Sequence, residues 1–122
     1  MIKKAINKQH GFYGIHVMGE LYGISYEKLD NLDIIVDCLT LGIELSKAKC
    51  EGMIVKKFKP KGISVVALLS ESHVSIHTYP EYNSLFLDAF TCGNTCNPEL
   101  IAEILKKELK ATSAKIDTLV RG

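Results

Sequence analysis

The chain has 122 residues, 47% of them hydrophobic and 24% charged, which is the composition of one folded domain with a packed core. Fifteen basic residues stand against fourteen acidic ones, and this near balance argues against nucleic acid or an anionic membrane as a partner. The first ten residues are partly basic but no apolar run follows them, so we expect a cytoplasmic protein whose four cysteines are free thiols.

The first half of the chain predicts a strand, a helix and a β-hairpin. Residues 14–22 alternate loosely between apolar and polar side chains, as a strand does. Asp30 is placed to cap a helix that Gly52 ends. The apolar positions of that helix share one face: Leu32, Ile35, Val36, Leu39 and Ile43. Two β-rich segments, 53–58 and 63–69, flank a Lys-Pro-Lys-Gly turn and predict the hairpin.

The second half predicts two more strands, a helix and a closing strand. Residues 73–79 favour a strand that Pro80 ends, and residues 85–92 favour another. Asn97 caps a helix, and residues 114–120 form the last strand. The order β-α-β-β-β-β-α-β predicts an α+β two-layer sandwich, a mainly antiparallel sheet with both helices packed on one face.

One stretch of the sequence is rich in reactive side chains. Residues 70–82 read Ser-Glu-Ser-His-Val-Ser-Ile-His-Thr-Tyr-Pro-Glu-Tyr, with more hydroxyls, imidazoles and carboxylates than strand packing needs. A second motif, Thr-Cys-Gly at residues 91–93, puts a thiol at the end of the following strand. We interpret the two segments together as a reaction centre.

Two simpler chemistries compete for these residues. Zinc accepts the ligand types of His73, His77, Cys92 and Cys96, and a non-catalytic metal-binding domain is therefore an alternative of another class. Residues four apart on a strand are separated by about 13 Å, however, so one ion could not easily bind both histidines. Cys92 is also compatible with a cysteine nucleophile or with a buried, inert thiol, and no local signature selects the nucleophile.

Taken together, residues 70–93 resemble the processing and active-site region of the prokaryotic, pyruvoyl-dependent S-adenosylmethionine decarboxylases. The shared pattern is Ser-Glu-Ser-His, then Ile-His-Thr with an aromatic residue and Pro-Glu-Tyr, then an aspartate and Phe-Thr-Cys-Gly. The similarity extends over residues 14–120, where these further positions match: Gly14-Ile15-His16, Glu20, Phe58 and Gly62-Ile63-Ser64.

The resemblance implies a proenzyme, a single domain of residues 1–122, that cleaves itself. The Ser72 hydroxyl would attack the carbonyl of Glu71 and turn the amide into an ester. His77 would assist the β-elimination that follows, and Ser64 would help to hold the ester. No free cofactor would be needed, because Ser72 itself would become the pyruvoyl group.

The expected products are a chain of residues 1–71 and a chain of residues 72–122 that begins with the pyruvoyl group. That group would decarboxylate S-adenosylmethionine through a Schiff base, with Cys92 as the proton donor. By resemblance, Phe58 stacks on the adenine and Glu81 binds the ribose hydroxyls. The product donates aminopropyl groups, which implies spermidine biosynthesis, and the family implies a homodimer of processed pairs. Pyruvoyl-dependent arginine decarboxylases of the same fold are an alternative.

Some positions depart from the expected pattern. Strict strand alternation from Ser72 puts His77 on the opposite face, so we expect a bend at the cleavage point. Tyr79 stands where tryptophan is common in the family, Asn83 follows where glycine is usual, and Cys96 is additional. These differences concern the shape of the pocket rather than the reaction.

Overall fold

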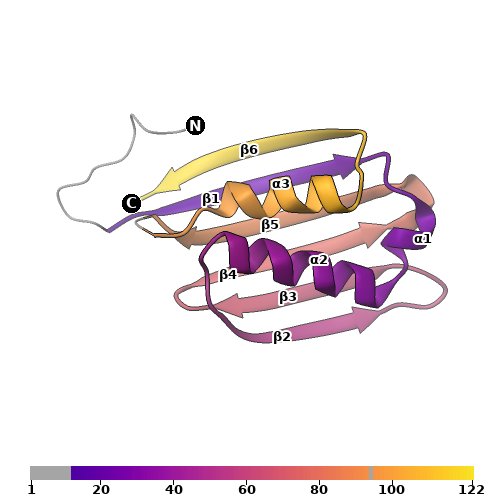
Figure 1. The fold of residues 1–122 in the computed structure, drawn as a ribbon, viewed down its shortest axis with the longest axis horizontal. Helices are drawn as coiled ribbons and strands as arrows, with labels where there is room; N and C mark the ends of the chain where they lie inside the picture. The colour runs from indigo at the N-terminus through magenta and orange to yellow at the C-terminus, as the bar shows by residue number, and fades with distance from the viewer. Residues whose placement is uncertain (1–11, 94) are drawn as a thin grey trace.

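The computed structural model describes residues 12–93 and 95–122, and the basic N-terminal stretch lies outside the described residues. Six strands form one antiparallel sheet in the order β2-β3-β4-β5-β1-β6 (Figure 1). The elements are, in chain order, β1 (Gly14–Tyr22), α1 (Tyr26–Leu29), α2 (Leu32–Leu45), β2 (Cys50–Lys57), β3 (Ile63–Leu69), β4 (Ser72–Tyr79), the 3₁₀ turn η1 (Pro80–Tyr82), β5 (Ser84–Cys92), α3 (Pro98–Glu108) and β6 (Ser113–Arg121).

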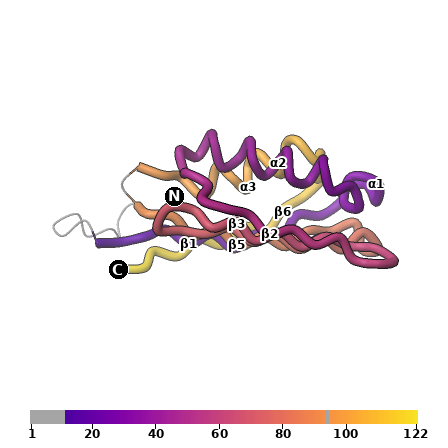
Figure 2. The backbone as a smooth tube through the Cα atoms, turned by 90° about the horizontal axis from the view of Figure 1, so that it is seen from below, coloured from indigo at the N-terminus to yellow at the C-terminus, as the bar shows by residue number. Residues whose placement is uncertain are grey.

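The helices α2 and α3 lie side by side on one face of the sheet (Figure 2). Alternate residues of the strands meet the apolar stripes of the two helices and form the core. These buried residues include Val17, Leu21, Val65, Ile76, Leu87 and Ala89 of the sheet and Ile35, Leu39, Ile43, Ile101 and Leu105 of the helices. The predicted α+β sandwich with an antiparallel sheet is confirmed.

The opposite face of the sheet, called the open face below, is not covered by helices in the described part of the chain (Figure 2). It presents several exposed apolar side chains, from strands across the whole width of the sheet: Met18, Ile54, Val66, Leu68, Phe86 and Leu119. A sheet of this kind normally exposes a polar face to water, and a broad apolar face indicates a contact surface.

The boundaries of α2 differ from the sequence-based prediction. Asn31, not Asp30, is the N-cap, and its side chain accepts a hydrogen bond from the backbone N–H of Ile34 at 3.1 Å. The helix ends at Leu45 with Ser46 as its C-cap, and Lys47 follows with a φ of 67°. Gly52 does not end the helix but lies in β2. The prediction was wrong here because a lysine takes the left-handed conformation that helix ends more often assign to glycine.

None of the helices within the described residues is long and apolar enough to cross a membrane. The cytoplasmic location stays a prediction.

Candidate active site

The expected cleavage point lies in the tight turn between β3 and β4. Ser70 and Glu71 form this turn, and Glu71 has a φ of 58°. A left-handed backbone at a residue with a Cβ costs about 1 kcal/mol or more, and such strain is typical of functional sites. The strained residue is the one whose carbonyl Ser72 would attack.

Ser72 and Cys92 meet beside this turn, because β4 and β5 are neighbours in the sheet. Ser72 is buried, with 8% of its surface exposed. Its hydroxyl accepts a hydrogen bond from the backbone N–H of Cys92 at 3.2 Å and lies 3.9 Å from the Cys92 Sγ. The residue after Cys92 is glycine for a steric reason, since a Cβ on Gly93 would lie 1.7 Å from the ring of Tyr13. We call Glu71, Ser72 and Cys92 the cleavage end of β4.

A cavity of about 740 Å³ opens at the cleavage end, and both Glu71 and Cys92 line it. Arg121 of β6 lines it as well, with its guanidinium 4.9 Å from the centre of the Phe90 ring. Sequence reasoning missed Arg121 and Tyr13, because they come from opposite ends of the chain and neither belongs to a local motif. A group formed at residue 72 would lie next to Glu71 and Cys92 of this lining, beside the thiol that is expected to act on it.

A second polar pair lies toward the other end of β4. Ser64 of β3 and His77 of β4 are directly opposite each other, and Ser64 Oγ lies 2.7 Å from His77 Nδ1. Both side chains lie on the open face. The sequence predicted the two strands but not their pairing or register, so this contact could not be predicted.

The two residues expected to bind substrate lie beside this pair. Phe58 and Glu81 line a cavity of about 220 Å³ together with Ser64 and His77. Phe58 follows β2 and is 43% exposed, and Glu81 lies in η1. We call Phe58, Ser64, His77 and Glu81 the substrate end of β4.

The structure does not bring Ser72 and His77 of one chain together. β4 pairs regularly with both neighbours from His73 to His77, without the expected bend. Ser72 belongs to the buried set of alternating residues, whereas His77 is exposed on the open face. Five residues along a strand span about 16 Å, so the two side chains are far apart as well as on opposite faces.

The proposed zinc ligands are also separated. His73 lies 4.0 Å from an oxygen of Asp88, which also contacts His16, and these three side chains form a polar patch on the open face. Within the described residues, no group of three or more histidine, cysteine or acidic side chains gathers as metal ligands would. All four cysteines are free thiols, and burial raises the pKa of Cys38.

The fold is a two-layer α+β sandwich in which a buried seryl hydroxyl and a thiol meet beside a hairpin turn. Comparison with known proteins narrows this class. The S-adenosylmethionine decarboxylase family matches residues 15–122. The S-adenosylmethionine decarboxylase proenzyme 2 of Bacillus cereus is 36% identical over 114 residues, covering 93% of both chains. The proenzyme of Shouchella clausii is 36% identical over 109 residues, covering 89% of this chain and 84% of the relative.

Solved structures agree with this match. The crystal structure of the adenosylmethionine decarboxylase from Aquifex aeolicus superposes with a TM-score of 0.82 and 27% identity, covering 89% of this chain and 90% of that one. The decarboxylase of Trypanosoma brucei, at 13% identity and a TM-score of 0.61, shares the fold. The chain belongs to the S-adenosylmethionine decarboxylase family. The expected carboxy-lyase with a self-generated pyruvoyl group is thereby confirmed at the level of the family.

Proposed function

We propose that this chain cleaves itself between Glu71 and Ser72 and then decarboxylates S-adenosylmethionine for polyamine synthesis. The observation that carries the proposal is the placement of the Ser72 hydroxyl, buried at a strained turn and 3.9 Å from the Cys92 thiol. Family membership supports the reaction, and the contact between Ser72 and Cys92 supports the roles proposed for these two residues.

Self-cleavage begins when the Ser72 hydroxyl attacks the carbonyl carbon of Glu71. The C–N bond breaks as the C–O bond forms, so the amide becomes an ester with a free amine on Ser72. A base then removes the Cα proton of Ser72, the Cβ–O bond breaks, and Glu71 leaves as a new C-terminal carboxylate. Tautomerisation and addition of one water release ammonia and leave the pyruvoyl group on the chain of residues 72–122. His77 is the base we assign to the elimination.

In the processed enzyme, the pyruvoyl group supplies the electron sink that decarboxylation of an amino acid requires. The Cys92 thiol lies on the neighbouring strand, within reach of the atoms attached to residue 72. It can therefore return the proton that replaces the lost carbon dioxide. The cavity at the cleavage end accommodates the reacting part of the substrate.

The nucleoside part of the substrate suits the substrate end of β4. The half-exposed ring of Phe58 offers a flat apolar surface for a purine, and the carboxylate of Glu81 accepts hydrogen bonds from ribose hydroxyls. Both line the same small cavity as Ser64 and His77, the two residues expected to assist the cleavage.

A second copy of the chain would bring a substrate end and a cleavage end together. In one chain, about 16 Å and the thickness of the sheet separate Ser72 from His77. If two open faces pack against each other about a two-fold axis, the substrate end of one copy can approach the cavity beside Ser72 of the other, which Phe90, Cys92 and Arg121 line. The apolar side chains of the open face, which include Leu68 at 61% exposure, support such a contact. We therefore propose a homodimer whose two sites each use both chains.

Mass measurement under denaturing conditions tests the cleavage. We expect two fragments in place of the 13.5 kDa chain, and a carbonyl at the new N-terminus of the smaller one that hydroxylamine can trap. An active preparation that contains only the intact chain would refute the proposal. Carbon dioxide release from S-adenosylmethionine and from arginine, measured in parallel, tests the substrate.

Co-expression of two inactive variants tests the shared site. Ser72→Ala keeps the substrate end and His77→Ala keeps the cleavage end, so a mixed dimer contains one complete site. We expect cleavage of the His77→Ala chain and recovery of decarboxylation only in the mixture. Mixed dimers that form but stay uncleaved would show that each chain processes itself.

A further inference from the structure

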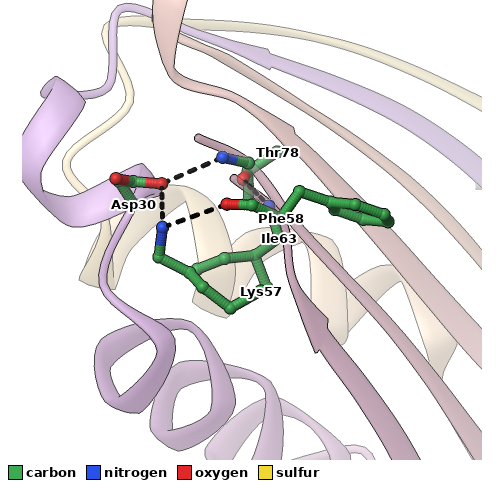
Figure 3. Close-up of polar contacts among 6 residues, drawn as sticks. Asp30, Lys57, Phe58, Ile63 and Thr78 are labelled. Atoms are coloured by element: carbon green, nitrogen blue, oxygen red, sulfur yellow. Dashed lines mark hydrogen bonds and ion pairs between the residues drawn. The ribbon is translucent and has the colours of Figure 1, made fainter. Parts of the chain in front are cut away.

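Asp30 lies outside every site described so far, yet its carboxylate reaches the loop that carries Phe58. It belongs to the short connection between α1 and α2. Its Oδ1 accepts a hydrogen bond from Lys57 Nζ at 2.9 Å and another from the backbone N–H of Gly62 at 2.9 Å (Figure 3). One side chain from the helix layer therefore binds both ends of the turn between β2 and β3.

Further hydrogen bonds close the turn between β2 and β3. The backbone N–H of Phe58 donates to the carbonyl of Gly62 at 2.8 Å, and Lys57 Nζ also reaches the carbonyl of Phe58 at 3.5 Å. The hydroxyl of Thr78 accepts from the N–H of Ile63 at 2.9 Å, which ties the turn to β4. The ring of Phe58 points away from the ion pair (Figure 3). The backbone of this residue is therefore held while its ring stays free for a ligand.

The charge of Asp30 strengthens its contacts with the turn between β2 and β3. The hydrogen bond from Lys57, and after it the N–H of Gly62, hold the pKa of Asp30 below its usual value. The carboxylate therefore remains ionised at neutral pH, and its side chain is only 21% exposed. Hydrogen bonds to an ionised group are shorter and stronger than those between neutral groups, so the turn is well anchored.

A similar tie holds the segment that carries Glu81. Asn83 follows η1 with a φ of 52°, and its side-chain amide donates to the carbonyl of Ile24 at 3.0 Å. In the backbone, the N–H of Ile24 donates to the carbonyl of Asn83 at 3.0 Å. The segment around α1 therefore contacts the turns that carry both Phe58 and Glu81.

We propose that Asp30 is a positioning residue for substrate binding, which holds the turn of residues 58–62 so that Phe58 is ordered before the nucleoside arrives. The inference rests on the proposed function, in which Phe58 contacts the adenine. Ordering an aromatic side chain in advance lowers the cost of binding, and its loss should weaken binding by about three- to tenfold. The Asp30 carboxylate contacts Lys57 and Gly62 rather than Ser72 or Cys92, so the chemical step should be unaffected.

Steady-state kinetics of the processed enzyme test this with a double-mutant cycle. We expect Asp30→Ala to raise KM for S-adenosylmethionine about three- to tenfold with kcat unchanged. Asp30→Asn, whose amide oxygen still accepts from Gly62, should fall between Ala and the parent, and Lys57→Arg should retain the parental KM. Adding Asp30→Ala to Phe58→Ala should raise KM no further than Phe58→Ala alone, because Asp30 acts through that ring.

The matched control is Asp33→Asn, an identical loss of charge at an exposed position in the first turn of α2. It should leave KM unchanged. A parental KM in Asp30→Ala, a fall in kcat without a change in KM, or additive effects of the two alanines would each overturn the positioning role. Failure of the proposed function is distinguishable, since the parent itself would then fail to cleave or to release carbon dioxide.

Discussion

The two ends of β4 hold their reactive groups in different ways. At the cleavage end, Ser72 is buried, the preceding residue is strained, and the thiol partner comes from the neighbouring strand. At the substrate end, His77 is exposed on the open face and pairs with Ser64 across a hairpin. One end suits the proposed reaction of the backbone with its own side chain, and the other faces outward.

This difference indicates how one short strand can serve two steps. The buried Ser72 hydroxyl is held by the backbone N–H of Cys92 beside the turn that it is expected to cleave. An exposed imidazole is free to act on a group that does not belong to its own strand. The separation of the ends is thus expected if the complete site forms only when two chains meet.

The largest expected effect is at the cleavage end. Ser72→Ala removes the hydroxyl proposed to attack the Glu71 carbonyl, so we expect no cleavage and no decarboxylation. Denaturing mass spectrometry should show the intact chain alone. Ser75→Ala, on the same strand but on the open face, is the control and should be cleaved as the parent is. Cleavage of Ser72→Ala would remove Ser72 from its assigned role.

Removal of the thiol separates processing from turnover. Cys92→Ala keeps the Ser72 hydroxyl, so the chain should still be cleaved, but kcat should fall by roughly a hundred- to ten-thousand-fold because the proton donor is lost. The measurement is carbon dioxide release by the cleaved enzyme, with Cys50→Ala, an exposed thiol on β2, as control. Equal kcat values for Cys92→Ala and the parent would contradict this role.

A charged side chain on the open face should break the proposed dimer and so separate the substrate end of one copy from the cleavage end of the other. Leu68→Lys replaces a side chain that is 61% exposed, so the single chain should still fold, but the dimer should dissociate and cleavage should slow. Analytical ultracentrifugation and mass spectrometry measure the two effects. Leu45→Lys, on the helix layer at 48% exposure, is the matched control. A Leu68→Lys monomer that cleaves at the parental rate would show that one chain is sufficient.

The smallest expected effect is a change in thermal stability at acid pH. The pKa of Asp30 is lower in the folded chain than its usual value of about 3.9, so its stabilising contribution is complete above that pH and is lost as the pH falls below it. The difference in Tm between the parent and Asp30→Asn should therefore be small at pH 7 and should shrink as the pH falls below the usual pKa of an aspartate. A difference that grows as the pH falls would contradict the depressed pKa.

Local patterns in the sequence predicted much of the fold. Apolar alternation located the strands, and a capped amphipathic pattern located α3, where Asn97 does accept a hydrogen bond from Glu99 at 3.1 Å. The N-cap of α2 was misassigned because Asp30 and Asn31 are adjacent residues of equal capping ability. Only their tertiary neighbours distinguish them, since Lys57 and Gly62 engage the carboxylate of Asp30.

The sequence by itself determined the residue types of the two motifs, the order of the main elements and the family, because each of these depends on the spacing of residues along the chain. The tertiary structure decided which residues meet. Ser72 and Cys92 are 20 residues apart and become neighbours through strand pairing, whereas Ser72 and His77 are five apart and are separated by the pleat. A strand turns alternate side chains to opposite faces, so nearness along the chain does not imply nearness in space.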